Sequence, residues 1–96
     1  EMPDPTDVRL TTEVNGRRLQ DGSTSDWLFP LPRLIAFLSG VMPLEPGDIV
    51  TTGTPAGVGV FRDPQVFLQP GDVVEIEGVG IGVLRTPIVA PPPVAP

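Results

Sequence analysis

The sequence contains no cysteine and no histidine, and only 5% of its residues are aromatic. Without cysteine the chain forms no disulfide and offers no thiolate ligand. Without histidine it lacks the commonest general base and the commonest metal ligand. These absences exclude zinc chemistry and Ser-His or Cys-His triads within the chain.

Basic residues are also few: six Lys and Arg stand against twelve Asp and Glu, which gives a net charge of -6. Such a chain has no electrostatic footprint for a nucleic-acid backbone or an anionic membrane surface. No apolar run approaches the ~18 residues of a membrane span, and the N-terminus lacks signal-peptide features. We therefore expect a cytoplasmic protein with neither a nucleic-acid nor a membrane partner.

The length of 96 residues and a hydrophobic content of 40% fit one domain of modest size. A domain this short buries only roughly 60 to 65% of the surface that its unfolded chain exposes, so partner surface is expected. Glu1 in place of Met suggests that these residues belong to something longer. The 14 prolines and 11 glycines separate patterned apolar runs, which predicts short strands joined by tight turns.

The first strand signal is an alternation of apolar and polar residues over residues 8–14, which ends at Asn15-Gly16. This dipeptide is the strongest short signal for a hairpin, because both residues tolerate positive φ. The return strand is expected at residues 17–20, and a polar turn or cap at residues 21–26. The hairpin register pairs Val14 with Arg17, Glu13 with Arg18, and Thr12 with Leu19.

The most hydrophobic cluster, Trp27-Leu28-Phe29, is predicted to lie in the core. A helix of about two turns follows, because Pro32 suits a first turn and the apolar residues after it have helical spacing. Gly40 stands where a left-handed cap is expected.

Two Pro-Gly turns, at residues 46–47 and 70–71, each precede a β-branched run, the first of which predicts a strand at residues 49–52. A last strand is expected within residues 79–89. Gly80 and Gly82 suggest a bulge or a close backbone approach there, and Pro87 favours the edge of a sheet. Residues 90–96 are proline-rich and are predicted to form a mobile polyproline tail.

Residues 51–60 form a glycine-rich and threonine-rich loop. Glycines let a backbone approach a ligand, and exposed N–H groups with threonine hydroxyls bind anionic oxygens. A plain glycine-rich turn is the alternative, and the loop matches no phosphate-binding pattern.

Carboxylates offer a second candidate site. Glu75 and Glu77 lie two apart in a strand, which fits half of a hard-metal site or an acidic edge facing solvent. Asp21 and Asp26 lie in the predicted turn, where hydrogen bonds from a carboxylate to the nearby backbone explain each residue without a catalytic role. None of these patterns alone identifies a reaction.

An ordered series of motifs resembles the fumarylacetoacetate hydrolase family. The series covers roughly residues 3–89 and is similar to the C-terminal part of the family's catalytic domain. Its segments are Val14-Asn15-Gly16 with Gln20, Thr24-Ser25, residues 44–50, residues 52–59 and residues 71–80.

The resemblance implies a mainly β chain with one short helix, forming part of a mixed β-sandwich or roll that is usually dimeric. It also implies an enzyme that binds Mg²⁺ or Mn²⁺, or Ca²⁺, and acts on 2,4-dioxo acids or their enols. Members hydrolyse a carbon-carbon bond, decarboxylate, or isomerise acids such as 2-hydroxyhepta-2,4-diene-1,7-dioate. The cation stabilises the enolate that forms as the bond breaks.

Carried over residue by residue, the resemblance assigns substrate binding to Thr54 and close backbone approach to Gly53. The family's metal carboxylates, its lysine and its lid residues precede the matched segment, so no catalytic or metal residue is assigned here. The pair Glu75 and Glu77 matches a different part of the family pattern. The 96-residue chain alone is therefore expected to be inactive, with its cation site supplied by an upstream part of the domain.

Three hypotheses remain open on the sequence. The first is a fragment of a metal-dependent enzyme, comprising residues 1–89 of catalytic domain and the tail at 90–96. The second is a non-catalytic binding or interaction module that retains the scaffold. The third is a remnant without function, which exposed apolar surface would favour.

Overall fold

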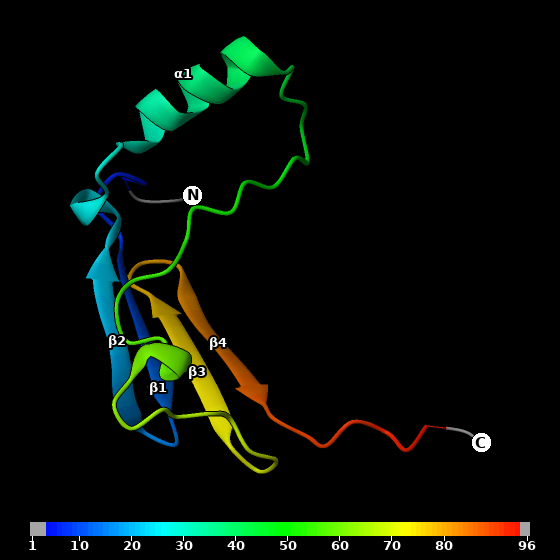
Figure 1. The fold of residues 1–96 in the computed structure, drawn as a ribbon. Coiled ribbons are helices and arrows are strands. Elements are labelled where there is room, and N and C mark those ends of the chain that lie inside the picture. Colours follow the sequence, from blue (N-terminus) through cyan, green and yellow to red (C-terminus); the bar gives the residue numbers. More distant parts are fainter. Residues whose placement is uncertain (1–3, 95–96) are drawn as a thin grey trace.

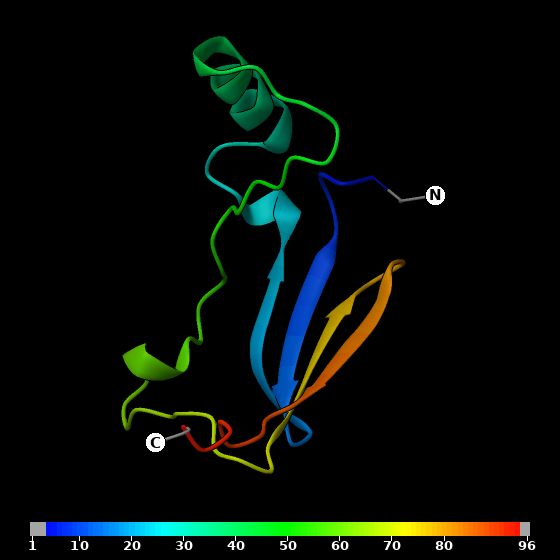
Figure 2. The same ribbon diagram turned by 90° about the vertical axis from the view of Figure 1, so that its right-hand side faces the viewer.

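The structure is a computed structural model that describes residues 4–94. Four antiparallel strands form one sheet in the order β2-β1-β3-β4 (Figure 1). The α-helix lies beyond one end of this sheet in both ribbon views (Figures 1 and 2). The elements are β1 (Arg9–Val14), β2 (Arg17–Ser23), the short 3-10 helix η1 (Thr24–Asp26), α1 (Leu31–Val41), the short 3-10 helix η2 (Gly59–Phe61), β3 (Val73–Gly78) and β4 (Gly82–Pro87).

The hairpin between β1 and β2 turns at Asn15-Gly16, where φ is 52° and 81°. Positive φ at both central residues is what a tight hairpin turn of this hand requires. The predicted pairs of Val14 with Arg17 and of Glu13 with Arg18 are confirmed.

The predicted pairing of Thr12 with Leu19 is wrong, because β2 contains a bulge. Thr12 pairs with Gln20, and the register shifts directly after Thr12, which leaves Leu19 opposite no residue of β1. The Leu19 carbonyl accepts a hydrogen bond from Arg62 Nη2 at 2.7 Å. With the extra residue accommodated, pairing resumes and β2 runs beyond its predicted end at residue 20.

Asn15 also joins the hairpin to β3. Its backbone N–H donates to the Val73 carbonyl, and its side-chain oxygen accepts from the Val73 N–H, both at 2.9 Å. Its side-chain amide donates to Asp72 Oδ1 at 2.9 Å. These bonds extend the pairing of β1 with β3 past its last strand pair and fix the register between them.

The last strand, β4, lies at the sheet edge, as Pro87 predicts. It begins at Gly82 because residues 79–81 form the turn from β3. The pairing of β3 with β4 is regular, so the predicted bulge is absent from it. Gly80 and Gly82, with φ of 83° and 142°, serve this turn instead.

The helix α1 has 11 residues, more than the two turns predicted, and Pro32 lies in its first turn as predicted. The cap predicted at Gly40 is wrong, because Gly40 lies inside the helix. The helix ends at Val41, and the next residue, Met42, has an extended backbone with φ of -146° and donates its N–H to the Leu38 carbonyl at 2.9 Å. Pro43 follows, and proline disfavours the helical conformation of the residue before it, which explains why the helix stops before Met42.

No helix within residues 4–94 is long and apolar enough to cross a membrane.

Two further predictions are wrong. Residues 49–52 form no strand, and Ile49 is 90% exposed, because no strand among the described residues lies beside this segment to pair with it. Leu28 and Phe29, predicted as core, are 87% and 51% exposed. Of the predicted tail, residues 90–94 have no regular secondary structure, and residues 95–96 lie outside the described residues.

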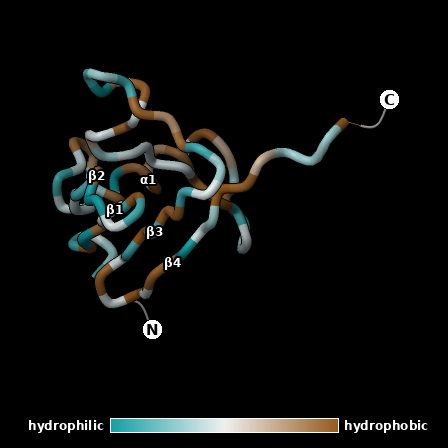
Figure 3. The backbone as a smooth tube through the Cα atoms, turned by 90° about the horizontal axis from the view of Figure 1, so that it is seen from below, coloured by the Kyte–Doolittle hydropathy of each residue, from teal (hydrophilic) through white to brown (hydrophobic). Residues whose placement is uncertain are grey.

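The sheet has one charged face and one apolar face, and hydrophobic and hydrophilic residues succeed one another along β3 and β4 (Figure 3). Residues opposite one another in paired strands share a face. The charged face carries the ion pairs Arg9–Asp21, Arg18–Glu13 and Arg85–Glu75. The apolar face carries Leu10, Val14, Val74, Ile76 and Leu84.

Much of the apolar surface has no covering layer within residues 4–94, where Val8 is the sole buried hydrophobic residue. The accessible surface is 7725 Å², against roughly 5,300 Å² for a compact protein of this mass. The radius of gyration is 16.7 Å, against roughly 12.5 Å for a compact chain of this length. The fold is therefore open, with its helix standing apart from its sheet.

We expect Asn15→Gly to make the Val73 amide exchange with solvent about fivefold faster, because it removes a hydrogen bond worth ~1 kcal/mol. Glycine keeps the left-handed turn free of strain. Hydrogen exchange followed by NMR in the complete polypeptide measures the effect. The control Ser39→Ala removes only a bond to the Ala36 carbonyl in α1 and should leave Val73 unchanged. Equal exchange in Asn15→Gly and the parent would contradict this role of the side chain.

Candidate functional site

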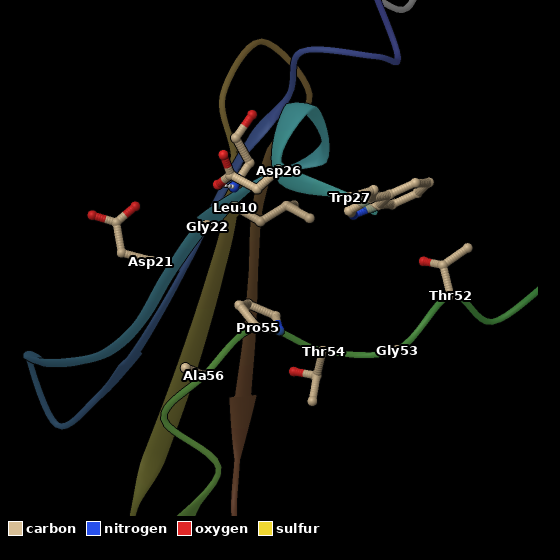
Figure 4. Close-up of a pocket in the computed structure, with 11 residues that line it drawn as sticks. Leu10, Asp21, Gly22, Asp26, Trp27, Thr52, Gly53, Thr54, Pro55 and Ala56 are labelled. Atoms are coloured by element: carbon tan, nitrogen blue, oxygen red, sulfur yellow. Dashed lines mark hydrogen bonds between the residues drawn. The ribbon is translucent and has the colours of Figure 1, made fainter. Parts of the chain in front are cut away.

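The loop at residues 52–56 forms one wall of a pocket of about 390 Å³, and β1, β2 and the segment after β2 form the opposite wall (Figure 4). Both predicted substrate-binding residues, Gly53 and Thr54, line it. The complete lining is Leu10, Asp21, Gly22, Ser23, Asp26, Trp27, Thr52, Gly53, Thr54, Pro55 and Ala56.

Thr54 also lines a second pocket, of about 310 Å³, so this residue lies where the two pockets adjoin. Figure 4 shows its side chain pointing away from Trp27 and Asp26. The second pocket is bordered mainly by apolar side chains, namely Val14, Leu19, Val58, Val66, Leu68 and Val74.

The Thr54 hydroxyl is held by Gln20. The side-chain amide of Gln20 donates to Thr54 Oγ1 at 2.8 Å and to the Pro55 carbonyl at 2.9 Å. A hydroxyl that accepts a hydrogen bond still carries one proton to donate. Thr54 is therefore a fixed neutral donor for an anionic oxygen.

Backbone donors adjoin this hydroxyl. Gly53 has φ of 92°, and a Cβ built on it would meet no atom within 4 Å, so its backbone faces open space. The N–H groups of Thr52, Gly53 and Thr54 donate to no protein acceptor within residues 4–94. Together these groups suit an acidic ligand that approaches the backbone closely.

Three close approaches attach the loop to β2. A Cβ on Gly22 would lie 3.0 Å from Pro55 Cβ, so any larger residue would push the loop away by a few tenths of an ångström. A Cβ on Gly57, where φ is 108°, would overlap the Leu19 carbonyl oxygen. Arg62 donates from Nε to the Gly57 carbonyl at 3.0 Å and from Nη2 to the Leu19 carbonyl at 2.7 Å.

The pocket carboxylates are both engaged. Asp21 lies in β2, not in a turn as predicted, and accepts two hydrogen bonds from Arg9, at 2.7 and 2.9 Å. The hydrogen bond from Arg9 is the main cause that lowers the pKa of Asp21; loss of hydration opposes it, and the positive charges of Arg9 and Arg18 add to the lowering. Asp26 accepts from the Ser23 N–H at 3.2 Å and caps η1, as its turn chemistry predicts.

The described residues do not fit a divalent cation. A hard cation takes several oxygen ligands at one point. Within residues 4–94 no three acidic residues cluster in this way. Glu75 and Glu77 lie on the charged face of β3. This strand is an inner strand of the sheet and not the predicted edge. Glu75 Oε1 lies 3.7 Å from Arg85 Nε.

Sequence reasoning missed the structural roles of Gln20, Arg62 and Trp27. Gln20 belonged to the motifs that carry the family resemblance but had no role predicted for it, and Trp27 was predicted to lie in the core. Arg62 has no local signal, because its carbonyl partner Leu19 lies 43 residues earlier in the chain.

Comparison with solved structures shows where this architecture occurs. Fumarylacetoacetate hydrolase from psychrophilic Exiguobacterium antarcticum is 44% identical with a TM-score of 0.86, over 92% of this chain and 32% of that chain. The 2-hydroxyhepta-2,4-diene-1,7-dioate isomerase from Mycobacterium marinum is 42% identical with a TM-score of 0.77, over 91% of this chain and 32% of that chain. Maleylpyruvate hydrolase from Sphingobium sp. SYK-6, in complex with manganese (II) ion and pyruvate, is 34% identical with a TM-score of 0.79, over 92% of this chain and 31% of that chain.

The sheet, the helix and the loop are thus a portion of a fold shared by hydrolases and isomerases, and the predicted fold class is confirmed. The family model for the C-terminal domain of fumarylacetoacetate (FAA) hydrolase matches residues 1–89. This chain belongs to the fumarylacetoacetate hydrolase family. It spans 29% of a relative from Staphylococcus epidermidis, an uncharacterized protein that is 46% identical over 86 residues, or 90% of this chain.

We expect Arg9→Met to raise the pKa of Asp21 toward its ordinary value of 3.8, because the largest cause of the lowering is removed. A lowered folded-state pKa stabilises the fold above about pH 4, and this contribution is lost as pH falls through the lowered pKa. NMR titration of the carboxyl carbon measures the shift. The control Arg33→Met removes a guanidinium that lies over the Phe29 ring and should leave the Asp21 pKa unchanged. An unchanged Asp21 pKa in Arg9→Met would refute this attribution.

Proposed function

We propose that this chain provides one wall of the substrate site in an enzyme that acts on 2,4-dioxo acids or their enols. The observation that carries the proposal is the Thr54 hydroxyl, held by Gln20 at 2.8 Å where two pockets adjoin. Gly53 and Thr54 bind an acidic oxygen of the substrate through backbone N–H groups and the hydroxyl. The family membership supports a small acid as the ligand.

The charge of the pocket requires help from outside this chain. Within residues 4–94 the pocket lining contains no lysine or arginine, and the whole chain carries a net charge of -6, so the wall by itself offers no positive charge to an anion. A divalent cation, Mg²⁺ or Mn²⁺ or else Ca²⁺, would supply the positive charge and act as a Lewis acid. Its ligands lie in a part of the enzyme outside this chain. A relative solved with manganese and pyruvate supports a divalent metal in this family.

The reaction is either hydrolysis of a carbon-carbon bond or isomerisation or decarboxylation of an acid such as 2-hydroxyhepta-2,4-diene-1,7-dioate. Relatives of both kinds support this range, one a maleylpyruvate hydrolase and another an isomerase. The wall described here serves either reaction. A hydrogen-bond donor to an acidic oxygen orients the substrate but does not determine which of its bonds breaks.

The uncovered apolar surface supports partners of two kinds. The total accessible surface, polar and apolar together, exceeds that of a compact protein of this mass by roughly 2,400 Å², which is comparable to the area buried in a permanent interface. The remaining part of the catalytic domain packs on this surface and brings the cation site to Thr54. Two copies of the enzyme then associate as a homodimer.

A non-catalytic interaction module is the second candidate, favoured by the lack of a cation ligand set within residues 4–94. Such a module would retain the sheet and present its apolar face to another chain. A stable complex with a second chain that has no copy of this segment would support the module over the enzyme.

We expect Thr54→Val in the complete polypeptide to raise KM about 10- to 150-fold, because a hydrogen bond to a charged group contributes ~1.5 to 3 kcal/mol. Metal affinity should remain nearly unchanged. Steady-state kinetics on an acylpyruvate and calorimetry with Mn²⁺ measure the two effects. The control Thr86→Val alters an exposed threonine of β4, outside both pockets, and should leave KM unchanged. Unchanged kinetics in Thr54→Val would exclude Thr54 from substrate binding.

We expect the purified 96-residue chain to bind Mg²⁺ or Mn²⁺ no more tightly than a random acidic peptide and to show no turnover. The physical reason is the scattered placement of its carboxylates, two of which are engaged by Arg9 or by η1. Calorimetry and an acylpyruvate assay on the chain alone test this. Mg²⁺-dependent turnover by the chain would overturn the claim that its partner segment carries the cation site.

A further inference from the structure

The bulge at Leu19 changes how β2 meets the loop. The strand pairs regularly with β1 up to Thr12 and Gln20, and the register then shifts by one residue. The extra residue turns the Leu19 carbonyl toward Arg62, which donates to it at 2.7 Å. Bulges of this kind re-aim neighbouring side chains.

Gln20, the next residue, is the side chain so aimed. Its amide spans from β2 to the loop and donates to Thr54 Oγ1 at 2.8 Å and to the Pro55 carbonyl at 2.9 Å. The amide is planar, so two simultaneous bonds fix its orientation and leave only its N–H face toward Thr54. The direction of the hydrogen bond is thereby set: Gln20 donates and the threonine oxygen accepts.

The same arginine holds the other end of the loop. Arg62 donates to the Gly57 carbonyl at 3.0 Å while it holds the Leu19 carbonyl. A planar guanidinium that bridges two carbonyls in this way ties the bulge and the loop into one rigid unit. Both bonds are part-buried, which protects them from exchange with water.

We propose that Gln20 and Arg62 are positioning residues for Thr54, with Gln20 occupying one of the two lone pairs of Thr54 Oγ1 so that the hydroxyl proton points away from Gln20 and is available to an anionic substrate oxygen. This inference rests on the proposed function of Thr54 and adds the device that orients it. Neither residue need touch the substrate. Arg62 acts through the bulge, and Gln20 acts through the hydroxyl.

Two substitutions of Gln20 separate orientation from simple support. Gln20→Met keeps the size of the side chain but removes both bonds, so the hydroxyl rotates freely. Gln20→Glu keeps the shape but presents a carboxylate, which accepts the Thr54 proton and reverses the hydrogen bond. In the complete polypeptide we expect KM to rise about fivefold in Gln20→Met and at least tenfold in Gln20→Glu, with kcat changed less than threefold.

A double-mutant cycle removes the effect of added charge. A carboxylate at residue 20 could also repel an anionic substrate without any action on Thr54. The effect of charge repulsion on KM would persist in the Thr54→Val background. The effect of a reversed hydrogen bond would disappear there, because the hydroxyl is absent. We expect Gln20→Glu to add less than a further twofold to KM in that background.

The matched control is Gln65→Glu. Gln65 makes the same kind of bond, from Nε2 to the Val60 carbonyl at 2.8 Å, but lines neither pocket. It should leave KM and kcat unchanged. Arg62→Lys, which keeps the charge but cannot bridge two carbonyls in one plane, should raise KM by a larger factor in the Thr54 parent than in Thr54→Val.

The outcomes separate this inference from the proposed function. If Thr54→Val raises KM and Gln20→Glu does not, the positioning role is wrong and the substrate contact stands. If Gln20→Met raises KM more than Gln20→Glu does, Gln20 only supports the loop. The same holds if kcat falls in proportion to the fraction of folded protein. If Thr54→Val has no effect on KM, the proposed function itself fails.

Discussion

The site depends on the attachment to strand β2 of residues 52–62, which comprise the pocket loop at residues 52–56 and the segment that follows it. This stretch has no strand to hold it, and only the short helix η2 gives it regular structure. Its position therefore comes from a few contacts between distant residues, above all the two bonds of Arg62 and the two bonds of Gln20. Glycine at residues 22 and 57 allows the backbones to approach closely enough for these bonds to form.

The same attachment places the neutral donors of Gly53 and Thr54 in the pocket lining of an acidic protein. Strand β2 contributes Asp21 to the pocket lining, but the Asp21 side chain points away from the loop (Figure 4) and accepts a hydrogen bond from Arg9. The loop presents backbone N–H groups and a hydroxyl. Under the proposed function, hydrogen bonds would orient a ligand with acidic oxygens, and a cation bound outside this chain would supply the charge that holds it.

The open shape fits a chain that spans about a third of the solved enzymes it resembles. The ion pairs on one face of the sheet are partly exposed, and on the opposite face and on helix α1 apolar residues such as Leu84 and Phe37 remain in contact with water. Burial of such surface is the main favourable contribution to folding, so the sheet and the helix depend on a further layer for much of their stability.

The sequence by itself determined the elements whose signals are local. Asn15-Gly16 fixed the hairpin turn, Pro32 the start of the helix, and Pro87 the edge strand, because each acts through its own backbone geometry. The ordered motifs also determined the family and the fold class. Tertiary structure alone decided the bulge at Leu19, the absence of a strand at residues 49–52 and the exposure of Phe29, since each depends on contacts, or missing contacts, far along the chain. The Gln20–Thr54 bond belongs with these, because it joins residues 34 positions apart that no local pattern brings together.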